Sequence, residues 1–134
     1  MDNLANKKKL VDRRKHKRLQ AQDGAFVLLS PGSAILGHIV EISMGGLAFL
    51  YITSGKPPNG SCELEILLAE QLVADHSLYF DKVPFKTISD FAIPNELSLG
   101  STTIRRRGVQ FGELTHNQTS ALEYFIQNHT IGEV

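Results

Sequence analysis

Two arginines near the amino terminus, Arg14 and Arg18, are four residues apart in a strongly basic segment. This segment, Lys7–Arg18, holds eight of the fourteen Lys and Arg residues of the chain. A guanidinium can donate paired hydrogen bonds to a phosphate or to the O6 and N7 atoms of guanine, and it can also stack on a base. The residue type and spacing therefore point to an anion site.

A compact turn, Glu41-Ile-Ser-Met-Gly-Gly46, follows further along the chain. The Glu41 carboxylate can only accept hydrogen bonds, whereas the Ser43 hydroxyl can donate or accept them at short range. We expect Gly46 to allow a positive φ and a close approach of a ligand to the backbone. A basic arm that reaches back to this turn would enclose an anionic ligand.

Composition limits the class of protein. At 134 residues the chain is expected to be one domain with a core of its own. Residues 1–18 carry eight basic and two acidic side chains, for a net +6, and the remainder carries a net −6, so a broad basic face for nucleic acid is not expected. There is no apolar run near the roughly 18 residues needed for membrane insertion, and no secretory signal is expected. The single cysteine excludes an internal disulfide and fits the reducing cytoplasm.

From residue 25 onward the sequence predicts β structure. Segments rich in strand formers are separated by turn residues and span Ala25–Ser30, Ala34–Ile42, Leu47–Ile52, Cys62–Leu68, Phe85–Phe91 and Thr102–Phe111. Thr115 then fits a helix N-cap, with Gln118 at the capping-box position and an apolar face formed by Leu122, Phe125, Ile126 and His129. This order predicts an antiparallel barrel of about six strands, closed or nearly so, and one closing helix. Residues 71–84 are open between a long loop and a further strand.

Three of these segments resemble the motifs of PilZ domains. RRKHKR at 13–18 contains RxxxR, the turn at 41–46 is similar to (D/N)xSxxG, and Gly108-Val-Gln-Phe111 before a helix resembles the GVxF strand of that family. The order and spacing agree over roughly residues 12–128. The resemblance implies an all-β fold, a six-stranded antiparallel barrel with a C-terminal helix. It also implies a PilZ-like domain over residues 12–134 and a flexible basic tail over residues 1–11.

Many PilZ domains bind the bacterial second messenger cyclic di-GMP. The resemblance implies that Arg14 and Arg18 contact the phosphates and guanine edges of this nucleotide. It also implies that Glu41, Ser43 and Gly46 contact a guanine.

Two positions modify this expectation. Glu41 stands where the family usually has Asp or Asn, and its extra methylene predicts weakened or rearranged recognition rather than loss of binding. In the family, an arginine just before the first motif arginine goes with an intercalated nucleotide dimer. Arg13 therefore favours two stacked cyclic di-GMP molecules.

The expected function is that of a sensor rather than an enzyme. Nucleotide binding would order the arm and change a contact with an unidentified effector protein. One alternative is a PilZ-like adaptor that acts through a protein partner without nucleotide. The other is a β-barrel nucleic-acid binder, against which the acidic body and the lack of an aromatic stacking platform count.

The remaining reactive side chains have structural interpretations. Arg105 and Arg107 should share one face of a strand and Arg106 the other. We expect this triplet to form mainly a solvated face, with a ligand contact by one member as the alternative. Cys62 is expected to be a small core residue. The histidines lack metal-like spacing and no catalytic arrangement is found, so no enzyme activity, metal or cofactor is predicted.

Overall fold

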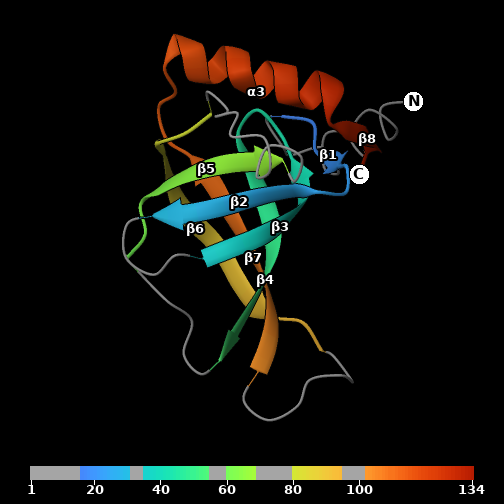
Figure 1. Ribbon diagram of the computed structural model, residues 1–134, viewed down its shortest axis with the longest axis vertical. Coiled ribbons are helices and arrows are strands. Elements are labelled where there is room, and N and C mark those ends of the chain that lie inside the picture. Colours follow the sequence, from blue (N-terminus) through green and yellow to red (C-terminus); the bar gives the residue numbers. More distant parts are fainter. Residues whose placement is uncertain (1–15, 31–34, 55–59, 69–79, 95–101) are drawn as a thin grey trace, which may run out of the picture.

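The computed structural model describes residues 16–30, 35–54, 60–68, 80–94 and 102–134. Within these ranges the chain forms eight strands and one helix (Figure 1). The strands are β1 (Leu19–Ala21), β2 (Ala25–Ser30), β3 (Ile35–Ile42), β4 (Gly46–Ser54), β5 (Glu63–Leu68), β6 (Val83–Ala92), β7 (Thr102–Phe111) and β8 (Thr130–Glu133). The helix, α3, spans His116–Asn128. The six strand segments expected from the sequence all form, with ends that differ by at most a few residues.

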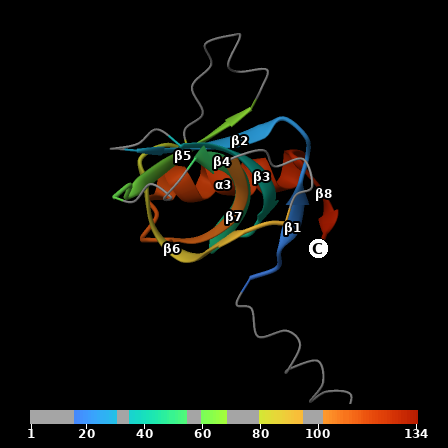
Figure 2. The same ribbon diagram turned by 90° about the horizontal axis from the view of Figure 1, so that it is seen from below.

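Six strands close into an antiparallel barrel. They are hydrogen-bonded in the order β2-β5-β6-β7-β4-β3, and the pairing of β2 with β3 closes the ring. Figure 2 views the barrel from its lower end and shows the strands curving around its axis, with α3 behind them. The predicted six-stranded barrel with a C-terminal helix is therefore confirmed.

Alternation of apolar side chains builds the barrel interior. In β2 the inward residues Val27 and Leu29 are fully buried, and they lie opposite Ile66 and Leu64 of β5. Burying a side chain of this size contributes about 1.5–3 kcal/mol. Cys62 departs from the expectation: it is exposed, because β5 begins one residue later and Cys62 lies outside the alternating run.

Helix α3 lies across one end of the barrel (Figure 1). Leu122 and Phe125 are buried against the core, as their spacing predicted. The capping box also forms: Gln118 N–H donates to the Thr115 hydroxyl (3.1 Å), and Thr115 N–H donates to Gln118 Oε1 (2.9 Å). Gln118 Nε2 donates to the Asp81 carbonyl at 2.9 Å, which ties the start of the helix to the loop before β6.

Two short strands, β1 and β8, were not predicted. β1 pairs with β3 on one side and with β8 on the other, both antiparallel. The Val134 N–H also donates to the Arg18 carbonyl at 3.0 Å. The end of the basic arm is therefore held between the C-terminus and the edge of the barrel. The predicted flexible tail over residues 1–11 lies outside the described residues.

Candidate functional site

A hollow of about 460 Å³ lies on the outer side of β3, β4, β6 and β7, next to the base of the arm. It is lined by His16, Arg18, Glu41, Ile42, Ser43, Gly45, Gly46, Leu47, Ala48, Ile88, Ser89, Phe91, Arg106, Gly108, Val109 and Gln110. Its volume is within the range of small-molecule sites in proteins.

The floor of the hollow is low because small residues align across three strands. Ala48 of β4 pairs with Gly108 of β7, and Gly108 pairs with Ser89 of β6. A Cβ atom added at Gly108 would meet Ser89 Oγ at 2.8 Å. The glycine of the GVxF-like segment therefore keeps the floor of the hollow flat.

A β-bulge turns Glu41 toward this hollow. Ile39 and Ile42 are both buried although they are three residues apart, since the register of β3 shifts between Ile39 and Glu41. A bulge of this kind re-aims the following side chain. Glu41 consequently pairs with Ala48 on the outer face instead of pointing into the core.

Two arginines from different parts of the chain meet at the Glu41 carboxylate. Arg18 Nη1 lies 3.2 Å and Arg106 Nη2 lies 3.3 Å from the same atom, Glu41 Oε1. The Glu41 side chain is 13% exposed, and those of Arg18 and Arg106 are 45% and 30% exposed. Arg18 reaches this position because β1, which begins at the next residue, pairs with β3 beside Glu41. The group carries a net charge of +1, so it favours an anion.

The turn after β3 is fixed by Ser43 and Gly46. The Ser43 hydroxyl accepts from Gly45 N–H at 3.1 Å, and Ser43 N–H donates to the Gly46 carbonyl at 2.8 Å. The expectation of a positive φ at Gly46 is wrong, because this residue is not among the glycines with positive φ. A Cβ atom there would instead lie 2.1 Å from the Val109 carbonyl oxygen, so glycine lets β4 and β7 approach closely.

Four of the six residues predicted for the site line this one hollow: Arg18, Glu41, Ser43 and Gly46. Arg13 and Arg14 lie outside the described residues. The sequence did not assign Phe91, which is 49% exposed and lines the hollow. Arg106 could be found from the sequence only through strand alternation, which predicts that its side chain points to the opposite face from Arg105 and Arg107. The structure confirms this orientation.

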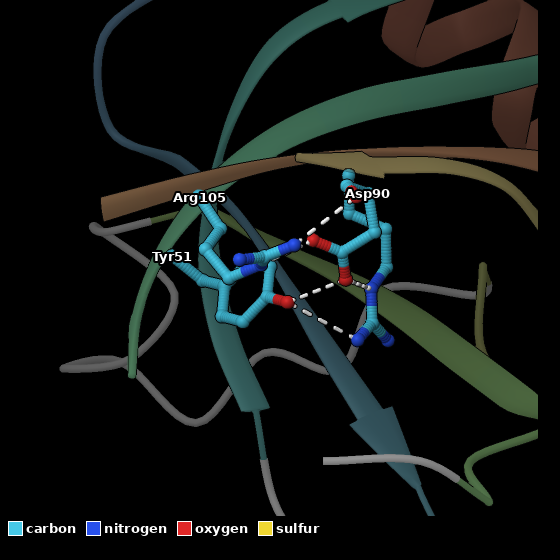
Figure 3. Close-up of polar contacts among 4 residues, drawn as sticks. Tyr51, Asp90 and Arg105 are labelled. Carbon is cyan, nitrogen blue, oxygen red and sulfur yellow. Dashed lines mark hydrogen bonds and ion pairs between the residues drawn. The ribbon is translucent and has the colours of Figure 1, made fainter. Parts of the chain in front are cut away.

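The other two arginines of the triplet form a polar network within the barrel wall (Figure 3). Asp90 accepts from Tyr51 Oη at 2.5 Å, from Arg105 Nε at 2.7 Å and from Arg107 Nε at 2.8 Å. Arg107 is buried and its guanidinium also lies over the Tyr51 ring, 5.1 Å from the centroid. The expectation of a mainly solvated face is thus wrong for Arg107, because inward positions of β7 face Asp90 and Tyr51.

This network shifts the pKa values of several of its members, among them Asp90 and Tyr51. Burial alone would raise the pKa of Asp90, but the hydrogen bonds from Tyr51, Arg105 and Arg107 outweigh it and hold the pKa below the usual value. Burial, with the hydrogen bond to Asp90, raises the pKa of the Tyr51 phenol. Asp90 is therefore a charged acceptor that compensates Arg107 at neutral pH.

No cluster of three or more His, Cys, Asp or Glu side chains that could hold a metal ion occurs in the described part of the chain. In the same residues, no helix has the length and apolar character needed to cross a membrane.

Comparison with known proteins identifies the fold. No protein-family model and no curated protein sequence matches the chain. Among solved structures it is similar to the PilZ domain with c-di-GMP of YcgR from Escherichia coli. The TM-score is 0.59 at 17% identity, over 88% of this chain and 92% of that one.

A second similar structure is MrkH, described as a c-di-GMP-dependent transcription regulatory factor, with a TM-score of 0.59 and 18% identity over 87% of this chain. The apo form of MrkH from K. pneumonia gives a TM-score of 0.54 at 15% identity over 84% of this chain. The chain spans about half the length of the two MrkH chains, 50% and 47%. These likenesses, together with the closed six-stranded barrel and its helix, show that this chain has the PilZ fold.

Proposed function

We propose that this chain is a cyclic di-GMP receptor of the PilZ family and that the hollow beside Glu41 is its nucleotide site. One observation carries the proposal: residues from the two motif-like segments, Arg18 from the first and Glu41, Ser43 and Gly46 from the second, line the same hollow. The PilZ domain of YcgR, which has a similar fold, is described with c-di-GMP.

The chemistry of the lining fits a guanine nucleotide with two phosphates. Arg18 offers a guanidinium that is 45% exposed and so accessible to a phosphate or a guanine edge. The Glu41 carboxylate can accept from the N1–H and N2–H₂ donors of guanine. Arg14 and Arg13, which precede Arg18 on the arm, would supply further guanidinium groups, and Arg13 favours two stacked nucleotides.

The arm is the element that would transmit binding. It joins the barrel at β1, next to Glu41, so a nucleotide gripped by Arg14 and Arg18 would order the preceding residues over the hollow. The ordered arm changes the surface that a bacterial effector protein in the cytoplasm would contact. The chain acts in this account by binding and not by catalysis.

Calorimetric titration with cyclic di-GMP tests the proposal. Wild-type protein should bind saturably, and Arg14→Ala and Arg18→Ala should each weaken binding by about tenfold or more, because a hydrogen bond to a charged group is worth about 1.5–3 kcal/mol. Lys17→Ala is the matched control, because it removes the same charge. The Lys17 side chain is 80% exposed and does not line the hollow.

Other outcomes of the titration select among the alternatives. A folded wild-type protein with no saturable binding would overturn the proposal and favour the adaptor. Tighter binding to oligonucleotides with a steep salt dependence would instead favour the nucleic-acid binder. One nucleotide per chain at saturation would refute the stacked pair expected from Arg13.

The adaptor is supported by one specific observation. Glu41 Oε1 already forms ion pairs with both Arg18 and Arg106, so guanine recognition by this carboxylate must compete with them. Because these pairs are partly exposed, their disruption costs about 1 kcal/mol each or less, which a nucleotide contact can offset.

A further inference from the structure

We infer that Arg106 and Phe91 form a base-binding subsite on the β6–β7 wall of the hollow, in which Arg106 donates to the O6 and N7 atoms of a guanine stacked against Phe91. This inference rests on the proposed function and assigns to it two residues outside the motif-like segments. It makes Arg106 a determinant of guanine specificity.

The position of Arg106 separates it from its two neighbours. Arg105 and Arg107 point to the opposite face of β7 and are engaged by Asp90. Arg106 points outward, lines the hollow and forms an ion pair with Glu41. Its guanidinium lies at 3.3 Å from Glu41 Oε1 through Nη2 alone, so it has further N–H donors for a ligand.

Phe91 is the cross-strand neighbour of Arg106 in the β6–β7 register. Side chains directly opposite each other in such a pair have Cβ atoms about 4.5–5.5 Å apart. Phe91 is 49% exposed, and Ile88 of the same strand, which also lines the hollow, is 61% exposed. An apolar surface of this kind beside a guanidinium suits a purine ring, which can stack on the aromatic side chain while its edge accepts hydrogen bonds.

The floor of the hollow leaves room for such a base. Ser89 and Gly108 form the row next to Phe91 and Arg106 on the same outer face, and both have small side chains or none. The same row continues through Ala48 to Glu41 on β3, and Glu41 joins Arg106 to Arg18 through one shared oxygen. The subsite is therefore continuous with the part of the hollow that the motif-like segments line.

A thermodynamic cycle that changes Arg106 in the protein and the N7 atoms in the ligand tests the inference. Affinities for cyclic di-GMP and for its bis(7-deazaguanine) analogue, which lacks both N7 acceptors, are measured for wild type and Arg106→Gln. We expect Arg106→Gln to weaken cyclic di-GMP binding by roughly tenfold to a hundredfold, the range of a bidentate arginine–guanine contact. The analogue should bind wild type less tightly, and this N7 penalty should shrink in Arg106→Gln. Arg106→Lys, which keeps the charge opposite Glu41 but not the planar fork, should also reduce the penalty.

Two controls separate the contact from general effects. Lys17→Gln removes one positive charge outside the hollow and should keep the full N7 penalty. Phe91→Ala should weaken binding by about tenfold or more through lost stacking. Ile52→Ala, which removes an exposed side chain of β4 outside the hollow (70% exposed), should not. All variants are compared by thermal melting. Lys17, Ile52 and Phe91 are exposed and Arg106 is half-buried, so only small changes in stability are expected.

The outcomes distinguish this inference from the proposed function. An N7 penalty in Arg106→Gln equal to that of wild type, or wild-type affinity in Phe91→Ala, overturns the subsite while the receptor proposal stands. Absence of cyclic di-GMP binding in folded wild type overturns the receptor proposal itself.

Discussion

Replacing Asp90 with asparagine should destabilise the protein strongly, although Asp90 does not line the hollow. Asp90 accepts hydrogen bonds from Tyr51, Arg105 and Arg107, and the Arg107 side chain is only 7% exposed. Removing one partner of a buried ion pair costs about 3–5 kcal/mol, because the other charge stays buried without compensation. The Asp90 side chain is 17% exposed, so water screens part of this interaction and about 2–4 kcal/mol is expected.

This loss is large compared with the total stability of about 5–15 kcal/mol of a typical domain. For a chain of this length it should lower the melting temperature by roughly 10 °C. Thermal and urea unfolding of Asp90→Asn measure it. Asp23→Asn is the control, since Asp23 is exposed in the turn before β2 and its replacement removes the same charge.

The pH dependence gives a second readout of the same network. The pKa of Asp90 is lower in the folded protein than its ordinary value of 3.8. Its contribution is therefore fully present above that ordinary value and is lost as the pH falls through the depressed value. The stability difference between wild type and Asp90→Asn should be constant near neutrality and shrink below about pH 4. A melting temperature of Asp90→Asn within about 2 °C of wild type at neutral pH would refute the reasoning.

Two further variants test how the fold positions the site. Gly46→Ala places a Cβ atom 2.1 Å from the Val109 carbonyl oxygen, so β4 and β7 must separate; a loss of about 1–3 kcal/mol in urea unfolding is expected, and an unchanged midpoint would contradict the close approach. Gln118→Ala removes the hydrogen bonds to Thr115 N–H and to the Asp81 carbonyl, and should cost about 1–2 kcal/mol, whereas Gln127→Ala on the exposed face of α3 should change stability little.

The sequence predicted the elements that carry a long run of strand-forming residues or a defined motif spacing. The strand Thr102–Phe111 and the capping box at Thr115 and Gln118 were found because they carry a sustained β-rich run and a defined spacing. β1 has three residues and β8 four, which is too short for a periodic signal. Their existence depends on pairing with each other and with β3, and this pairing places Arg18.

The site was predictable in part for a similar reason. Arg18, Glu41, Ser43 and Gly46 were found from local motifs, but the bulge that turns Glu41 outward depends on the register with β4. The burial of Arg107 could not be predicted, because its partners Asp90 and Tyr51 are 17 and 56 residues away in the chain. Arg106 and Phe91 became site candidates only when the β6–β7 register placed them side by side.

The central claim, that cyclic di-GMP binds in the hollow, is tested most directly by an amide-resolved NMR titration. Saturable shifts are expected at residues 18, 41–43, 45–46, 106 and 108–110, which line the hollow, and at the arm residues 12–17. The exposed face of α3 around Gln127 should be unaffected. Absence of shifts in the folded protein, or shifts confined to residues away from the hollow, would contradict the claim.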